Sequence, residues 1–292
     1  MRIRILTVLA VVATLLGLTT NAQAIVHGVP DNGAHPYVGQ LLFYDPTAVD
    51  PRFDDPGGWF TCTGTLVDAD TVVTAGHCTY PVGSGGEDVW ISFAEVPNFD
   101  ILPASSGFVP DGNQERYEAW KEALDASPEW IEATAIAHPE YDDAAFFEHD
   151  LGVLQLQGAG PAATPVRLPY ADQLADLYAQ DKQQRYTAVG YGLEGSGPKT
   201  SFGGDTRRTA DLRLVNLNGV GGNGGGTSAK FSSNANTGGT CFGDSGGPVF
   251  GPDNTLVAVV SYGLNSNCAG TSGAYRIDQP DDLEFLATYV TG

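Results

Sequence analysis

The chain has 292 residues, of which 42% are hydrophobic, and its 35 acidic and 14 basic side chains give a net charge of −21. Such a surface repels nucleic acid and anionic membranes, which excludes nucleic-acid binding as the main function. The length is sufficient to bury a full core, and all-β chains of this size occur as single units.

The first 24 residues have the parts of a secretory signal peptide. Arg2 and Arg4 form a positive end, residues 5–18 an apolar core, and Ala22-Gln23-Ala24 a small-residue cleavage site. The apolar core is shorter than the roughly 20 residues of a membrane-spanning helix, which disfavours the alternative of an uncleaved anchor. We therefore expect a secreted chain of residues 25–292, with no membrane attachment after cleavage.

Short apolar runs rich in β-branched residues follow along the chain. They lie between glycines and prolines at residues 65–75, 150–156, 186–192, 210–217 and 255–263. Many short strands with turn-rich spacing predict an antiparallel barrel or sandwich rather than βαβ units. The glycine-rich residues 218–229 are interpreted as a flexible connector.

Two segments have helical periodicity. Tyr117, Trp120 and Leu124 recur at three and four residues within 113–126, and apolar residues recur likewise within 280–290. Acidic residues stand at the start of the second segment, as at many helix N-termini. We expect the second helix to dock on a β-rich body.

The chain contains four cysteines, Cys62, Cys78, Cys241 and Cys268. An even number in an exported chain indicates disulfides, with three possible connectivities. No C-x-x-C pair occurs, which disfavours a zinc ribbon or a thioredoxin-type site.

The string C-F-G-D-S-G-G-P-V at residues 241–249 surrounds Ser245 with glycines. Glycines allow a tight turn and bring amide N–H groups close to a bound substrate. Serine is a weak nucleophile and needs a base, so a histidine must be found. The string also matches the G-x-S-x-G turn of α/β-hydrolases, but in those enzymes the histidine follows the serine. All five histidines of this chain precede Ser245, which excludes that order.

The strongest candidate for the base is His77, because it alone follows an apolar strand and a turn glycine. Asp150, directly before an apolar run, is the candidate partner of the imidazole. The competing acids are Asp142 and Asp143. The competing histidines are His27, His35, His138 and His149.

The three motifs follow one another along the chain in the order histidine, aspartate, serine. They are T-A-G-H-C around His77, H-D-L-G-V-L-Q-L around Asp150 and G-D-S-G-G-P around Ser245. With these motifs the chain resembles the chymotrypsin-like (trypsin-fold) serine proteases. The resemblance implies an all-β fold of two six-stranded antiparallel β-barrels with the active site between them and a C-terminal helix. The barrels would span about 25–165 and 166–292. It also implies a secreted, monomeric endopeptidase that acts on polypeptides and needs no metal or cofactor.

The resemblance assigns a role to each motif residue. Ser245 would attack the peptide carbonyl, His77 would transfer the proton, and Asp150 would hold the imidazole tautomer. The backbone N–H groups of Gly243 and Ser245 would form the oxyanion hole.

In this family the amino group of a terminal Ile-Val forms a buried ion pair with the acid before the serine. Here Ile25 and Val26 directly follow the predicted signal cleavage site, and Asp244 precedes Ser245. We expect signal removal itself to create the active form, the alternative being cleavage a few residues away. His27 is a departure, since the family usually has glycine at that position.

The resemblance further implies disulfides Cys62–Cys78 and Cys241–Cys268. It places the floor of the specificity pocket at Gly239 and Thr240, its walls at Gly263 and Gly273, and the strand that pairs with substrate at Ser261, Tyr262 and Gly263. Trypsin-like members have an aspartate at the floor, so we expect cleavage after neutral, large apolar or aromatic residues.

Two insertions stand out. One, at about 98–135, holds the first predicted helix, which either rims the cleft on the side of the residues before the scissile bond or is a surface decoration. The other, the acidic residues 50–58, is more often solvated than a calcium site. Rival functions are an inactive homologue that acts as a binding protein and a secreted esterase.

Overall fold

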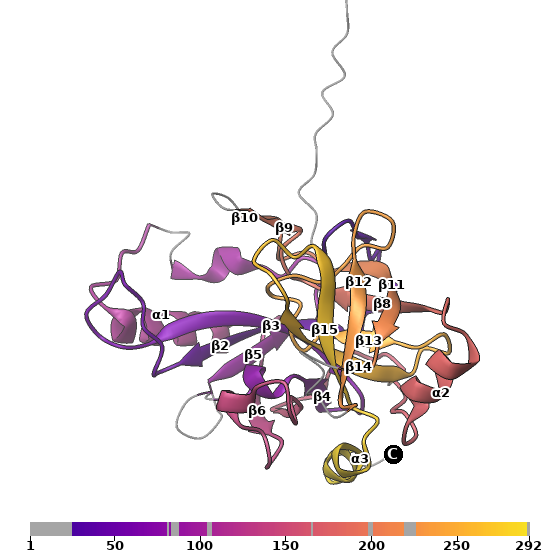
Figure 1. Ribbon diagram of the computed structural model, residues 1–292. Helices are drawn as coiled ribbons and strands as arrows, with labels where there is room; N and C mark the ends of the chain where they lie inside the picture. Colours follow the sequence, from indigo (N-terminus) through magenta and orange to yellow (C-terminus); the bar gives the residue numbers. More distant parts are fainter. Residues whose placement is uncertain are drawn as a thin grey trace, which may run out of the picture.

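Two antiparallel barrels lie side by side in the computed structural model, the first at the indigo-to-magenta end of the chain and the second at the orange-to-yellow end (Figure 1). The structure describes residues 25–80, 82, 88–103, 107–164, 166–197, 201–218 and 226–290. The predicted signal peptide, residues 1–24, lies outside these residues, as does most of the glycine-rich connector at 218–229.

The first barrel closes in the order β2-β3-β4-β7-β6-β5. Its strands are β2 (Val38–Asp45), β3 (Gly58–Leu66), β4 (Thr71–Thr74), β5 (Val89–Ser92), β6 (Ile131–Ala137) and β7 (Gly152–Leu156).

The second barrel runs in the order β11-β12-β15-β14-β13-β8 and is closed by pairing of β8 with β11. Its strands are β8 (Arg185–Gly190), β11 (Arg208–Asn216), β12 (Ser228–Ser233), β13 (Pro248–Phe250), β14 (Leu256–Gly263) and β15 (Gly270–Arg276). The short strand β1 (Val29–Pro30) adds to β11, and β9 (Gly195–Ser196) pairs with β10 (Ser201–Phe202). Two six-stranded antiparallel barrels confirm the expected fold class.

The predicted strands occur with one adjustment. Residues 65–75 are a hairpin rather than one strand, because β3 ends at Leu66 and β4 begins at Thr71. The backbone turns over residues 68–70, and the amide of Val67 donates to the carbonyl of Thr71 at 2.8 Å. The Asp-Ala-Asp sequence at this point is typical of a turn.

Each barrel has its own apolar core, and a third cluster joins the two. The joining cluster packs Val73 and Val153 of the first barrel against Val189 and Val259 of the second. A rigid interface therefore sets the position of one barrel relative to the other, which is what a site between them requires.

The helices are α1 (Asn113–Asp125), α2 (Gln173–Gln180) and α3 (Pro280–Ala287). Helices α1 and α3 confirm the two predicted helical segments. Helix α2 was not predicted because it has only two turns, yet its Leu174 is fully buried in the core of the second barrel. None of the described helices is long and apolar enough to cross a bilayer.

The two ends of the described chain each dock on the barrel that lies farther away in sequence. Strand β1 near the start pairs with β11 of the second barrel. Leu286 of α3 packs in the joining cluster, and the hydroxyl of Thr71 donates to the carbonyl of Tyr289 at 3.1 Å. These contacts bring Ile25 to the second barrel, close to the turn that carries Ser245.

Candidate active site

Three strand ends deliver the predicted catalytic side chains to one place. His77 lies on a short helical turn (Gly76–Cys78) just after β4, and Asp150 lies just before β7. Because Thr74 of β4 pairs with Gly152 of antiparallel β7, these two residues emerge at the same end of the first barrel. Ser245 comes from the second barrel, in the turn before β13.

The His77–Asp150 pair is fixed by several hydrogen bonds. The Nδ1 atom of His77 lies 3.0 Å from each carboxylate oxygen of Asp150, and the backbone N–H of His77 donates to Oδ1 at 2.9 Å. The Asp150 side chain is fully buried, and the hydroxyl of Ser261 donates to its Oδ2 at 2.5 Å. With Nδ1–H donating to Asp150, the neutral imidazole leaves Nε2 free to accept a proton.

Burial by itself would lower the pKa of His77, but the charge of Asp150 and its hydrogen bond outweigh burial and raise the pKa. The site therefore favours the imidazolium more than water does. The arrangement therefore stabilises the protonated form of His77 that arises when the base takes a proton during the reaction.

The turn that carries Ser245 is bound to both barrels. The carbonyl of Ser245 accepts the N–H of Thr63 at 2.7 Å, and the N–H of Gly246 donates to the carbonyl of Val260 at 2.7 Å. Gly246 has a φ of +75°, and a Cβ there would lie 2.0 Å from the hydroxyl of Thr74, so only glycine fits.

The amides of Gly243 and Ser245 donate no hydrogen bond within the part of the chain that the structure describes. Gly243 has a φ of +96°, a left-handed conformation that glycine adopts without strain. Two amide donors are thus left available beside the serine.

Two hollows meet at His77, Asp143, Phe242 and Ser245. The first, called here the specificity hollow, has a volume of about 340 Å³. The second, called here the cleft hollow, has a volume of about 710 Å³ and extends past the Cys62–Cys78 disulfide toward β3. A chain laid across Ser245 would have one hollow on each side.

Four of the predicted substrate residues line the specificity hollow: Thr240, Ser261, Tyr262 and Gly263. The described lining does not include Gly239 or Gly273, and their role at the pocket stays a prediction. A Cβ on Gly239 would lie 1.9 Å from the hydroxyl of Ser233, and one on Gly273 would lie 2.1 Å from the ring of Tyr262. Side chains from neighbouring strands therefore cover both glycines.

Sequence reasoning also missed three apolar residues of this hollow, Phe146, Phe242 and Val260. Phe242 is half exposed beside Ser245, and Phe146 contacts the ring of Tyr262 edge to face with 6.1 Å between the ring centroids. No motif marks these residues, although Phe242 directly follows Cys241 in the serine motif.

The competing histidines and acids have other partners. His138 and His149 stack on each other with 4.9 Å between ring centroids, His35 contacts Asp31, and Asp142 caps a short turn. Asp143 lines both hollows without a hydrogen bond to His77 among the described residues. His27 is exposed near the start of the described chain.

Ile25 and Asp244 are both fully buried. Asp244 accepts the N–H of Gly192 at 2.8 Å and the N–H of Cys241 at 2.8 Å, and it forms no ion pair with a described residue. Burial, reinforced by the nearby carboxylate of Glu194, raises the pKa of Asp244 to about 7. Among the residues that the structure describes, no cationic side chain is paired with this buried acid.

Backbone hydrogen bonds hold the segment that follows Ile25 on the second barrel. The amide of Gly239 donates to the carbonyl of Val26 at 2.9 Å. The guanidinium of Arg208 donates to the carbonyl of Gly28 at 2.7 Å. Because Val26 and Gly28 are bound to the barrel, they also fix the position of Ile25.

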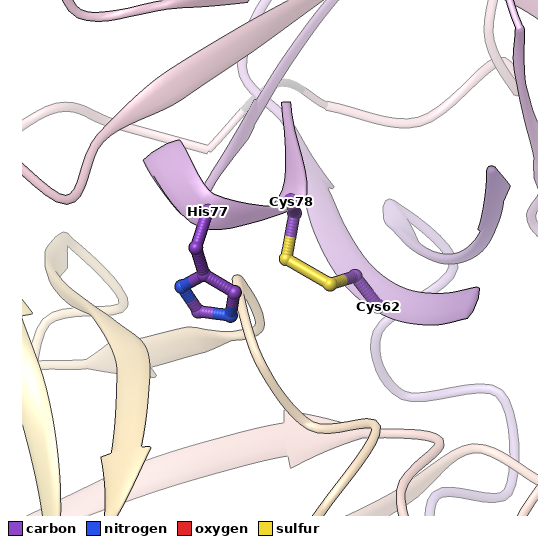
Figure 2. Close-up of side chains that lie close together, drawn as sticks. All are labelled: Cys62, His77 and Cys78. Atoms are coloured by element: carbon purple, nitrogen blue, oxygen red, sulfur yellow. A yellow bond between two sulfur atoms is a disulfide. The ribbon is translucent and has the colours of Figure 1, made fainter. Parts of the chain in front are cut away.

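The two disulfides confirm the implied pairing. Cys62–Cys78 adjoins His77, as Figure 2 shows, and Cys241–Cys268 borders the specificity hollow. Each bridge thus anchors an element that carries a candidate catalytic residue.

Two groups of side chains bring potential metal-ligating atoms together. In the first, Cys62 and Cys78 are joined to each other and His77 is bound to Asp150. The second contains His138, His149, Asp281 and Asp282. There His138 Nδ1 accepts the N–H of Glu140 at 3.2 Å, so its proton is on Nε2.

The acidic segment 50–58 is already engaged by the protein. Asp50 pairs with Arg52 at 2.6 Å and with Arg116 at 3.3 Å. Asp55 accepts the N–H of Asn113 at 2.9 Å and so caps α1. These contacts account for the carboxylates of Asp50 and Asp55.

Comparisons with known proteins agree with this architecture. A family model described as Trypsin matches residues 121–279. A curated protein from Saccharopolyspora erythraea, described as "Trypsin", is 31% identical over 233 residues, which is 75% of this chain and 83% of that protein.

Among solved structures, a collagenase has a similar fold, with a TM-score of 0.62 and 18% identity over 90% of this chain and 97% of that one. An inactivated protease paralogue of the scabies mite also has a TM-score of 0.62, with 14% identity over 90% of this chain and 97% of that one. The match to the family model and the curated relative, together with the fold, establish that this chain is a member of the trypsin family of serine-type endopeptidases.

Proposed function

We propose that the protein is a secreted endopeptidase, residues 25–292 after removal of residues 1–24, with Ser245, His77 and Asp150 as its catalytic triad. The observation that carries the proposal is the buried Asp150, which orients the His77 ring where it shares two hollows with Ser245. The intact triad favours turnover over a purely binding role.

In the proposed reaction, Ser245 Oγ attacks the peptide carbonyl while His77 Nε2 takes its proton. The imidazolium that forms is stabilised by Asp150, and the new oxyanion accepts N–H bonds from Gly243 and Ser245. His77 then gives the proton to the departing amine, which breaks the C–N bond. Water, activated by the same imidazole, hydrolyses the acyl-enzyme and restores Ser245.

We further propose that the freed amino group of Ile25 supplies a cation for Asp244. The burial of Ile25 and Val26 supports this, because their backbone lies on the barrel that carries Asp244. The ion pair would hold the turn with Gly243 and Ser245 in its active shape. Secretion and activation would then be a single cleavage.

Extending or acetylating the terminus at Ile25 is expected to lower kcat/KM at least about 100-fold, since each misplaced oxyanion donor costs about 10²–10³ in kcat. A buried carboxylate partner raises an ammonium pKa above the free value of about 7.7–8.0. The contribution of the pair is therefore present below that raised pKa and lost as pH rises through it. Activity of the native terminus should fall at alkaline pH, and full activity of the blocked chain would contradict the pair.

The specificity hollow is expected to take neutral, large side chains. Its described lining includes apolar and aromatic residues around Thr240, and its one carboxylate, Asp143, also lines the cleft hollow. We expect kcat/KM after Phe, Tyr or Leu to exceed that after Arg or Lys by about 100-fold, because the proposed floor residues Gly239 and Thr240 offer no carboxylate to a buried cation.

A peptide library digested by the secreted protein and sequenced by mass spectrometry measures this preference. Comparable cleavage after Arg or Lys would show that the pocket assignment is wrong. Matched ester and amide substrates distinguish an endopeptidase from an esterase, which would hydrolyse only the ester at a useful rate.

A further inference from the structure

A third hollow lies outside the proposed catalytic machinery, between α1 and the loop before β3. It has a volume of about 440 Å³. We call it the aromatic pocket because five aromatic side chains line it, Phe53, Trp59, Phe60, Phe108 and Trp120. The charged residues Asp50, Arg52 and Arg116 also line it, and Asp50 pairs with both arginines.

The walls of the aromatic pocket are held in place by the protein itself. Arg116 is 8% exposed and lies over the rings of Phe53 and Trp120, at 5.4 and 5.6 Å from their centroids. Trp120 packs on Trp59 with 5.2 Å between ring centroids. Asp55 caps α1 and so ties the loop to the helix. A pocket whose walls are already ordered loses little entropy when a ligand binds.

The aromatic pocket continues the cleft hollow. Trp59 and Phe60 line both, and the cleft hollow reaches from them to Ser245 and His77. If the residue before the scissile bond occupies the specificity hollow, the chain after the bond must leave through the cleft hollow. That path leads to the aromatic pocket, so α1 would adjoin the side of the departing chain, a placement different from both alternatives that the sequence left open.

The path between Ser245 and the aromatic pocket is acidic. Asp45, Asp143 and Asp205 line the cleft hollow, and its described lining contains neither lysine nor arginine. A basic side chain after the scissile bond would enter a hollow whose charged acidic and basic lining residues are carboxylates alone among the described residues.

We propose that the aromatic pocket is a subsite for the departing part of a polypeptide substrate, which places a large aromatic or apolar side chain in it. The acidic cleft hollow selects Lys or Arg between that side chain and the scissile bond. This inference rests on the proposed endopeptidase function and names the substrate class of the same cleft.

The test uses fluorogenic peptides that share one acyl part and differ after the scissile bond. The shortest peptide has only two residues after the scissile bond. The other peptides have ten residues after it, with Lys close to the bond and a single Trp whose position differs from one peptide to the next. Each of these has a matched peptide with Ala at the position of the Trp. We expect the best Trp position to raise kcat/KM at least about 10-fold over its Ala match, as filling an apolar pocket does. Replacing Lys by Glu should lower kcat/KM.

Trp120→Ala and Phe108→Ala are expected to bring the Trp-to-Ala ratio of kcat/KM close to one. Phe108 lies in a loop, so its variant keeps the test valid if Trp120→Ala does not fold. The matched control is Tyr170→Ala, an exposed aromatic that lines none of the three hollows, and it should retain the full ratio.

A second measurement does not depend on turnover. With Ser245 blocked by a fluorophosphonate, a peptide containing only the departing sequence should change the tryptophan fluorescence of the parent and not of Trp120→Ala. Hydrolysis of the short peptide with no gain from any Trp position would overturn the subsite alone. Absence of both hydrolysis and Ser245 labelling would instead overturn the proposed function.

Discussion

Ser245→Ala is expected to lower kcat by about a million-fold, because removal of the nucleophile alone abolishes nearly all of a triad's contribution. The substitution leaves the proposed substrate contacts, the two hollows and the strand Ser261–Gly263, in place, so KM should change little. A residual rate of about 10³–10⁴ over the uncatalysed reaction should persist through the amide donors of residues 243 and 245.

Single-turnover kinetics on purified Ser245→Ala, with an active-site titration to exclude contaminating enzyme, measures this loss. The folded state should be unaffected, because the turn is held by backbone bonds to Thr63 and Val260. A variant that retained even a hundredth of the parent rate would show that another group attacks the carbonyl.

Asp150→Asn is expected to lower kcat by about 10⁴-fold at neutral pH. The carboxylate accepts Nδ1–H of His77, whereas an amide at that position can donate and so favours the tautomer with the proton on Nε2. Nε2–H cannot take a proton from Ser245. The geometry would be preserved while the base is disabled.

The pH profile provides a second readout of Asp150→Asn. Asp150 raises the pKa of His77, and the base is active only when neutral, so activity falls as pH drops through that pKa. Without the charge, the acid limb of the residual activity should move to lower pH. Ser261→Ala, which removes one donor to Asp150 but leaves the tautomer intact, should be far less damaging. Equal losses in both variants would contradict the tautomer argument.

The sequence predicts much of this site because its motifs stand at strand ends. Once β4 and β7 pair, His77 and Asp150 must emerge together, and the glycines around Ser245 require a tight turn. The same local information explains why the strands and the helices α1 and α3 were predictable.

Other features depend on packing between segments that are distant in sequence. Spacing from the serine locates the backbone of Gly239 and Gly273 but cannot show that Ser233 and Tyr262 cover them. Likewise, the periodicity of α1 does not reveal which side of the cleft it joins, because that depends on its contacts with Trp59.

The central claim is that Ser245 is a nucleophile activated by a terminus formed on secretion. The most direct measurement treats the secreted protein, with no protease added, with a fluorophosphonate and maps both the labelled peptide and the amino terminus by mass spectrometry. The account predicts stoichiometric labelling of Ser245 in a chain that begins at Ile25. An unlabelled protein beginning at Ile25 would contradict it.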